Sequence, residues 1–71
     1  MKSIINKVWT DNDAVYIQTN EEKTFSECFN NYPRLRNATS IQRSRFEYDN
    51  IGIRWEELDE DLSFRGFMNN I

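Results

Sequence analysis

The chain has 71 residues, a net charge of −3, and 30% charged and 14% aromatic residues. This length fits one domain over residues 1–71, which buries only about 60% of the surface that its unfolded chain exposes. The charge content excludes a membrane-embedded class, and the aromatic content excludes a disordered class.

Histidine is absent and glycine occurs twice. Most zinc sites and every Ser/His or Cys/His relay need histidine, and phosphate-binding loops need glycine. The lone Cys28 indicates a reducing compartment, and we expect it to be a buried or half-buried hydrophobic residue. Residues 1–9 do not combine a charged start with a long apolar run, so we expect no secretory leader. No run of apolar residues is long enough to span a bilayer. These features predict a cytoplasmic, non-enzymatic protein without a cofactor.

The first part of the chain predicts an antiparallel meander. Strands are expected over residues 4–9, 14–19 and 23–26, joined by polar turns at 11–13 and 20–22. In the second strand, Val15, Ile17 and Thr19 alternate with polar or aromatic neighbours and should share one face. Other elements must therefore cover that apolar face.

The middle of the chain predicts short helices. Pro33 suits the first position of a helix over residues 33–37. Thr39 and Gln42 form a capping-box pattern that starts a helix over residues 40–46. Two alternatives remain for residues 27–50: one longer helix, or a helix followed by an edge strand over residues 46–48.

The last part of the chain predicts a strand over residues 51–55, with Ile51, Ile53 and Trp55 on one face. Ser63 is a good N-cap for a final helix over residues 64–69. The predicted fold class is therefore α+β. We expect a small three- to four-stranded, mainly antiparallel sheet with the N-terminal meander, packed against two or three short helices.

Residues 52–63 follow the pattern G-[IV]-x-W-x-x-L-D-x-D-[IL]-S and resemble a small bacterial family, domain of unknown function 2442. The landmarks are Gly52, Trp55, Leu58, Asp59, Asp61, Leu62 and Ser63. The resemblance implies a small cytoplasmic α+β domain without assigned activity, in a family where some relatives adjoin helix-turn-helix domains or toxin-like genes. The chain departs from the family pattern at residues 20–22, where Asp-Gly is usual, and at Arg65, where an acidic residue is common.

The segment 56–61 carries five carboxylates, from Glu56, Glu57, Asp59, Glu60 and Asp61. Asp59 and Asp61 with a neighbouring glutamate would suit a hard cation, although the glycine and distant glutamate of a calcium loop are missing. A two-carboxylate hydrolase would need a cleft that raises one pKa. We favour a structural role. Trp55, Leu58 and Leu62 would anchor the segment, while Asp59, Asp61 and Ser63 would cap the last helix. In this interpretation only Glu56, Glu57 and Glu60 remain free to contact a partner.

Four arginines form a basic group: Arg34, Arg36, Arg43 and Arg45. Residues 33–46 carry +4, residues 47–61 carry −6 and the rest −1, which sums to −3. The interpretation that we favour for these oppositely charged segments is ion pairing within the chain. Self-association through complementary patches is second. Nucleic-acid binding is third, because the net charge is negative.

The favoured function is a non-enzymatic protein-interaction or regulatory module, whose partner is another protein or a second copy in a homodimer. The alternatives are an accessory nucleic-acid-contacting or toxin–antitoxin-linked regulator, and a carboxylate metal site. We expect Trp9 and Trp55 in the core. An exposed tryptophan would instead be the best contact residue, because Trp, Tyr and Arg dominate interface energies.

Overall fold

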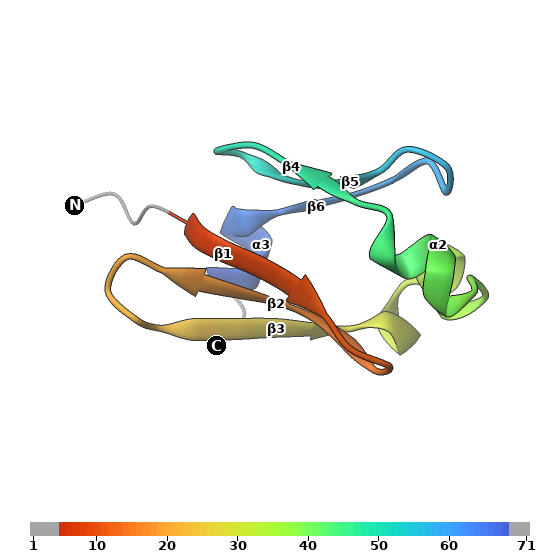
Figure 1. Cartoon of the computed structure of the whole chain (residues 1–71), viewed down its shortest axis with the longest axis horizontal. Helices are drawn as coiled ribbons and strands as arrows, with labels where there is room; N and C mark the ends of the chain where they lie inside the picture. The colour runs from red at the N-terminus through yellow and green to blue at the C-terminus, as the bar shows by residue number, and fades with distance from the viewer. Residues whose placement is uncertain (1–4, 69–71) are drawn as a thin grey trace.

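The computed structural model describes residues 5–68 (Figure 1). The strands are β1 (Ile5–Thr10), β2 (Ala14–Thr19), β3 (Thr24–Cys28), β4 (Glu47–Tyr48), β5 (Gly52–Trp55) and β6 (Glu60–Ser63). The helices are η1 (Phe29–Asn31), α1 (Pro33–Arg36), α2 (Ser40–Ser44) and α3 (Phe64–Met68). The α+β class is confirmed. The predicted boundaries at residues 4 and 69 lie outside the described residues.

The strands form two antiparallel three-stranded sheets, ordered β1-β2-β3 and β4-β5-β6. The sequence predicted one sheet, and the difference arises from β6, which pairs Ile53 with Leu62 and Arg54 with Asp61. Aspartate and glutamate are uncommon in strands, so the acidic composition of this segment hides the strand. Figure 1 shows one sheet above the other, with α2 and α3 toward opposite ends.

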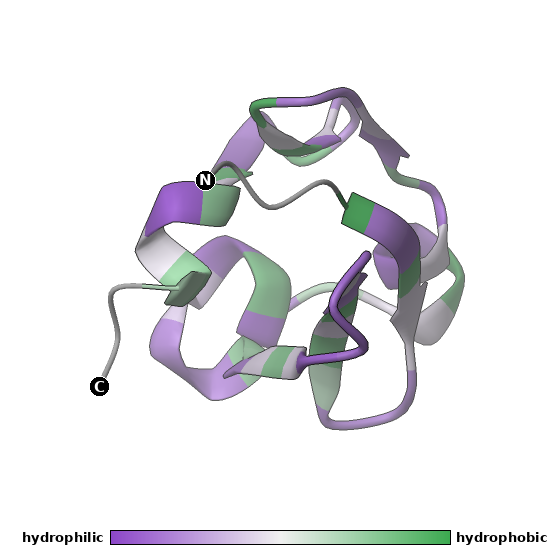
Figure 2. Ribbon diagram, turned by 90° about the vertical axis from the view of Figure 1, so that its left-hand side faces the viewer, coloured by the Kyte–Doolittle hydropathy of each residue, from purple (hydrophilic) through white to green (hydrophobic). Residues whose placement is uncertain are grey.

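The core joins both sheets. Val15 and Ile17 of β2 are fully buried in one cluster with Ile53 and Trp55 of β5 and Leu62 of β6. The same cluster includes buried residues of the helical segments: Phe29, Leu35, Phe64 and Phe67. Figure 2 shows polar and apolar residues alternating along the strands. The predicted face of β2 is confirmed, because Val15, Ile17 and Thr19 are all buried. The Trp55 indole N–H donates to the Arg43 carbonyl at 2.9 Å, so the largest core side chain has its polar atom satisfied.

The helices begin where their sequence signals predict. Pro33 occupies the first turn of α1. The capping box is confirmed, because the Gln42 backbone N–H donates to the Thr39 hydroxyl at 3.1 Å and the Gln42 side chain accepts from the Thr39 N–H at 2.9 Å. Helix α2 ends at Ser44, and β4 follows. Of the two alternatives for this region, the edge strand is therefore correct.

Two predictions were wrong: that Ile51 shares a face with Ile53 and Trp55, and that Cys28 is buried or half-buried. Ile51 is 71% exposed, because β5 begins at Gly52 and the Asp49 carboxylate holds Ile51 in the preceding turn by accepting its N–H at 2.8 Å. Cys28 is exposed, since it ends β3 on the face opposite to the core. Within residues 5–68, the helices are too short or too polar to cross a bilayer.

Candidate functional site

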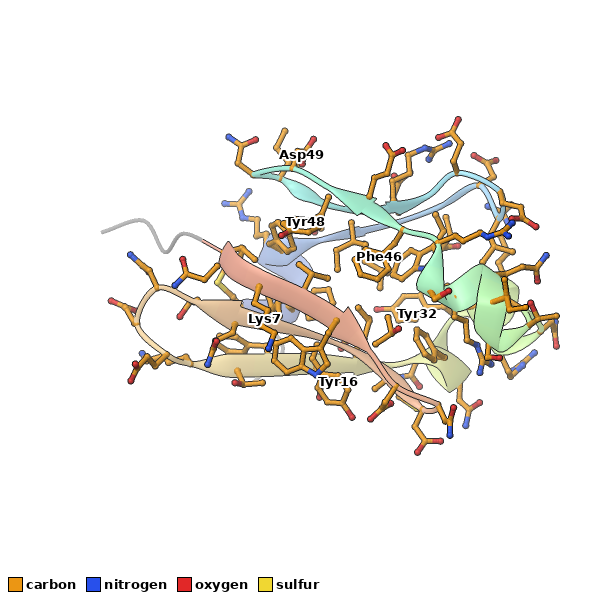
Figure 3. All side chains as sticks on the ribbon, in the orientation of Figure 1. Lys7, Tyr16, Tyr32, Phe46, Tyr48 and Asp49 are labelled. Carbon is orange, nitrogen blue, oxygen red and sulfur yellow. The ribbon has the colours of Figure 1, made fainter. Side chains whose placement is uncertain are left out.

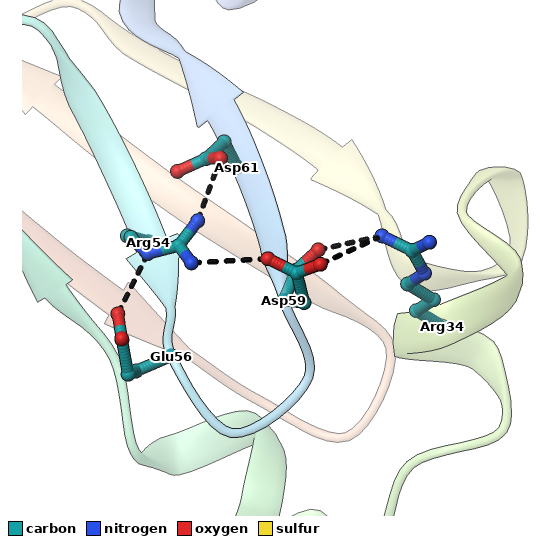
Figure 4. Close-up of polar contacts among 5 residues, drawn as sticks. All are labelled: Arg34, Arg54, Glu56, Asp59 and Asp61. Carbon is teal, nitrogen blue, oxygen red and sulfur yellow. Dashed lines mark hydrogen bonds and ion pairs between the residues drawn. The ribbon is translucent and has the colours of Figure 1, made fainter.

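Arg54 binds three carboxylates of the acidic segment (Figure 4). Its Nε donates to Glu56 at 2.7 Å and its Nη1 donates to Asp61 at 2.8 Å. Its Nη2 donates to Asp59 at 3.0 Å. These bonds raise the pKa of Arg54, with Glu56 as the largest cause, so the guanidinium stays charged. Asp59 reaches Arg54 from a left-handed backbone conformation with a φ of 51°.

The predicted capping role is wrong for Asp59 and Asp61. Strand β6 places Asp61 opposite Arg54, so both carboxylates bond this guanidinium rather than the N–H groups of α3. The role is confirmed for Ser63, whose hydroxyl accepts the Gly66 N–H at 3.1 Å. The anchoring roles are confirmed too, because Leu62 is buried and Leu58 packs against the core.

The structure gives the metal alternative no support. Arg54 already donates hydrogen bonds to Glu56, Asp59 and Asp61, the carboxylates that such a site would use. Across residues 5–68, no group of three or more Cys, Asp or Glu side chains could hold a metal ion. Three of the five carboxylates of the acidic segment therefore form an ion-pair network around Arg54.

Two arginines of the basic group pair with the acidic segment. Arg34 donates to the Asp59 carbonyl at 2.6 Å and lies 4.0 Å from its carboxylate. Arg45 lies 3.7 Å from the Glu57 carboxylate, which also accepts from Gln42 at 2.9 Å. Such exposed pairs contribute about 0–1 kcal/mol each. These pairs bring the basic group and the acidic segment together within one chain.

Arg43 has a structural role. Its Nε donates to the Leu35 carbonyl at 2.8 Å and its Nη2 to the Arg36 carbonyl at 2.8 Å. Its Nη1 donates to the Asn12 carbonyl at 3.3 Å. The first two carbonyls close α1, where the helix end attracts a cation. This side chain therefore joins α2 to α1 and to the β1–β2 turn.

The structure places the seven predicted contact residues in different environments. Arg36 is exposed and has no ion pair within residues 5–68. Glu60 is half-buried at the start of β6, opposite Trp55. Three of the four arginines that the nucleic-acid alternative uses, Arg34, Arg43 and Arg45, contact groups of this chain.

A hollow between β3, β6 and α3 is lined in part by Glu27, Tyr32 and Ser63. The Tyr32 hydroxyl donates to Glu27 at 2.6 Å. Burial, followed by this hydrogen bond, raises the pKa of Tyr32 to about 12. The phenol therefore stays protonated at neutral pH and is unsuited to act as a base or a nucleophile.

The sheet β1-β2-β3 carries an aromatic pair, Trp9 and Tyr16, on the side away from the core. The two residues are opposite each other in register, with ring centroids 5.4 Å apart and planes 13° apart. The Lys7 ammonium lies 5.1 Å from the Trp9 ring centroid. The Tyr16 hydroxyl donates to Asp11 at 2.5 Å. Figure 3 labels Lys7 and Tyr16 on the near side of this sheet, while α3 passes behind it in Figure 1.

We call this side of the sheet the outer face. By strand alternation and register it comprises Lys7, Trp9, Ala14, Tyr16, Gln18, Thr24, Ser26 and Cys28. The prediction that Trp9 lies in the core is wrong, because Val8 and Ile17 point inward and turn Trp9 outward, where it is half-buried. The sequence signal that could have predicted this outward position was the alternation of Val8 with Trp9 along β1. The prediction that Trp55 lies in the core is confirmed.

Two packed antiparallel sheets with short helices at their ends define a small α+β domain. The chain matches the family described as "Protein of unknown function (DUF2442)" over residues 5–71, and it belongs to this family. A crystal structure of a protein of unknown function from Rhodospirillum rubrum ATCC 11170 is similar in fold. It has 27% sequence identity and a TM-score of 0.82 over 100% of this chain and 90% of that chain. No curated protein matches the chain.

Proposed function

We propose that this domain is a non-enzymatic protein-interaction or regulatory module of the bacterial cytoplasm, and that the outer face is its contact surface. The observation that carries the proposal is the stacked aromatic pair on that face. Tryptophan and tyrosine are enriched among the residues that dominate interface energies. Lys7 and Asp11 are exposed beside the pair and supply the polar rim that interfaces need.

The direction of the pKa shifts supports a non-enzymatic role. Hydrogen bonds lower the pKa values of Asp11 and Asp49, so both stay ionised. The pKa of Tyr32 rises to about 12, so this phenol stays neutral. Catalytic acids and bases need pKa values near the working pH. The shifts instead move the pKa of each of these groups further from neutral pH.

A pull-down from the native cell tests the proposal with Trp9→Ala as the variant and Ile51→Ala as the matched control. Both changes remove an accessible apolar side chain, but Ile51 lies outside the outer face, in the β4–β5 turn. We expect Trp9→Ala to lose a partner that Ile51→Ala retains. Melting curves must first show that both variants are folded, and Trp9→Phe, which keeps a ring, should retain part of the binding.

Two outcomes would overturn the proposal. One is a partner set that is the same for wild type and folded Trp9→Ala. The other is turnover of a substrate that Asp59→Asn or Asp61→Asn abolishes, because those carboxylates contact only the network around Arg54 and Arg34 among the described residues.

A further inference from the structure

We propose that the outer face binds a second copy of this chain. The two sheets would pack face to face about a twofold axis that lies in the interface and crosses β1 at Trp9, perpendicular to the strand. This inference rests on the proposed function and names its partner.

The first argument is the order of side chains along β1. Lys7, Trp9 and Asp11 follow one another at a spacing of two residues, which places them on one side of an extended chain. Asp11 lies just beyond the end of β1. Its carboxylate is held beside the outer face by the Tyr16 hydroxyl at 2.5 Å. The face therefore carries a cation, an aromatic pair and an anion in a row.

The second argument is that this row is self-complementary. The proposed twofold axis makes the partner's β1 antiparallel, so Lys7 faces the partner's Asp11 and Asp11 faces the partner's Lys7. The aromatic pairs of the two copies then meet at the centre, where interface energy concentrates. Each copy contributes the same surface, as a closed dimer requires.

The charges also select the axis. A twofold axis parallel to β1 would place Lys7 against the partner's Lys7 and Asp11 against the partner's Asp11. Like charges brought together in an interface are unfavourable. The perpendicular axis replaces these repulsions with two equivalent ion pairs.

The size of the face sets the expected strength. Three strands of about six residues cover roughly 20 Å by about 15 Å. This is smaller than the ~800 Å² per partner of a standard interface. The dimer should therefore be weak and depend on concentration, and salt should weaken it further by screening the rim charges.

Sedimentation equilibrium over a range of concentrations tests the proposal, with Lys7→Glu as the variant and Lys23→Glu as the matched control. Both changes take the net charge from −3 to −5, because each replaces +1 by −1. Lys23 is exposed and precedes β3, outside the Lys7, Trp9 and Asp11 row. We expect Lys7→Glu to raise the dimer dissociation constant roughly tenfold or more, since two attractive pairs become repulsive. Lys23→Glu should have a much smaller effect.

Cys28 reports whether the outer face is the interface. It is the sole cysteine, it is exposed, and it lies on the outer face opposite Ala14. Its alkylation rate should fall as the wild-type concentration rises through the dissociation constant, and it should not fall in Lys7→Glu. Pairing through the β1 or β4 edge would leave Cys28 equally reactive at all concentrations.

The dimer proposal is overturned by a wild type that stays monomeric to about 1 mM, equivalent to less than about 4 kcal/mol of binding free energy. It is equally overturned by a dimer in which Cys28 stays reactive, or in which Lys7→Glu and Lys23→Glu behave alike. None of these results removes the interaction-module proposal, which fails only through the Trp9 pull-down or a discovered catalytic activity.

Discussion

The guanidinium of Arg43 lies over the ring of Phe29, 4.8 Å from the ring centroid. Phe29 is buried. The three guanidinium nitrogens of Arg43 donate to backbone carbonyls of two separate segments, helix α1 and the β1–β2 turn. One side chain from α2 thus fixes η1, α1 and the β1–β2 turn against one another. This arrangement explains why an arginine grouped by sequence with contact residues is part of the scaffold.

Arg43→Ala should lower the free energy of unfolding by about 2–4 kcal/mol. It removes charge-assisted hydrogen bonds and a cation–π contact. Arg43→Lys should recover only part of the loss, because an ammonium cannot reproduce the forked guanidinium geometry. Urea denaturation measures both effects. Arg36→Ala is the control, and its change should stay within about 0.5 kcal/mol because its side chain is exposed. Equal losses for Arg43→Ala and Arg36→Ala would contradict the structural role.

Signals carried by neighbouring residues predicted much of the fold. The alternation over β2, the capping box of Thr39 and Gln42 and the N-cap at Ser63 are all local patterns, and all are confirmed. Trp55 is buried for the same reason, because it alternates with Arg54 along β5 and shares a face with Ile53.

Features that depend on distant partners could not be predicted. Strand β6 is acidic, so its own composition does not favour a strand. It pairs with β5, where Arg54 lies opposite Asp61 and donates to its carboxylate. Arg43 reaches the Asn12 carbonyl across 31 residues of sequence. The outward position of Trp9 depends on the register between β1 and β2, and register is a tertiary property.

Gly52→Ala should destabilise the protein by about 2–3 kcal/mol. A Cβ at Gly52 would lie 2.5 Å from the Leu62 carbonyl oxygen and 3.0 Å from the Ser63 Cα, so the β5–β6 pairing would have to shift. Gly66→Ala is the matched control, because its nearest neighbour would be the Ser63 hydroxyl at 3.4 Å. In helix α3 this change should stabilise by about 0.5–1 kcal/mol. Thermal melting of both variants tests the opposite signs, and a harmless Gly52→Ala would refute the close approach.

Calcium, magnesium or manganese at millimolar concentration should leave the melting temperature of the wild type unchanged. A ligand that binds only the folded state must stabilise it, and a cation at this site would have to displace Arg54 from Glu56, Asp59 and Asp61. Arg54→Ala should cost little stability, because these ion pairs are exposed to solvent. The variant also releases the carboxylates, so divalent cations should stabilise it more than they stabilise the wild type. A cation-dependent rise in the wild type itself would restore the metal alternative.

Asp49 should make stability depend on pH in the acidic range. Its carboxylate accepts the N–H groups of Ile51 at 2.8 Å and Gly52 at 3.1 Å, and these bonds lower its pKa below 3.8. A folded-state pKa below the unfolded-state value contributes stability that is fully present above the unfolded-state pKa. That contribution is lost as the pH falls through the folded-state pKa.

Asp49→Asn isolates this contribution, because the amide oxygen can still accept an N–H but carries no charge. The wild type should melt at a higher temperature than the variant at neutral pH, and the difference should shrink as the pH falls below about 4. Melting curves between about pH 2 and pH 7 measure it. Asp49→Ala, which loses the acceptor as well, should be less stable than Asp49→Asn at every pH. A difference between wild type and Asp49→Asn that stays constant over this range would show that the charge of Asp49 does not stabilise the turn before β5.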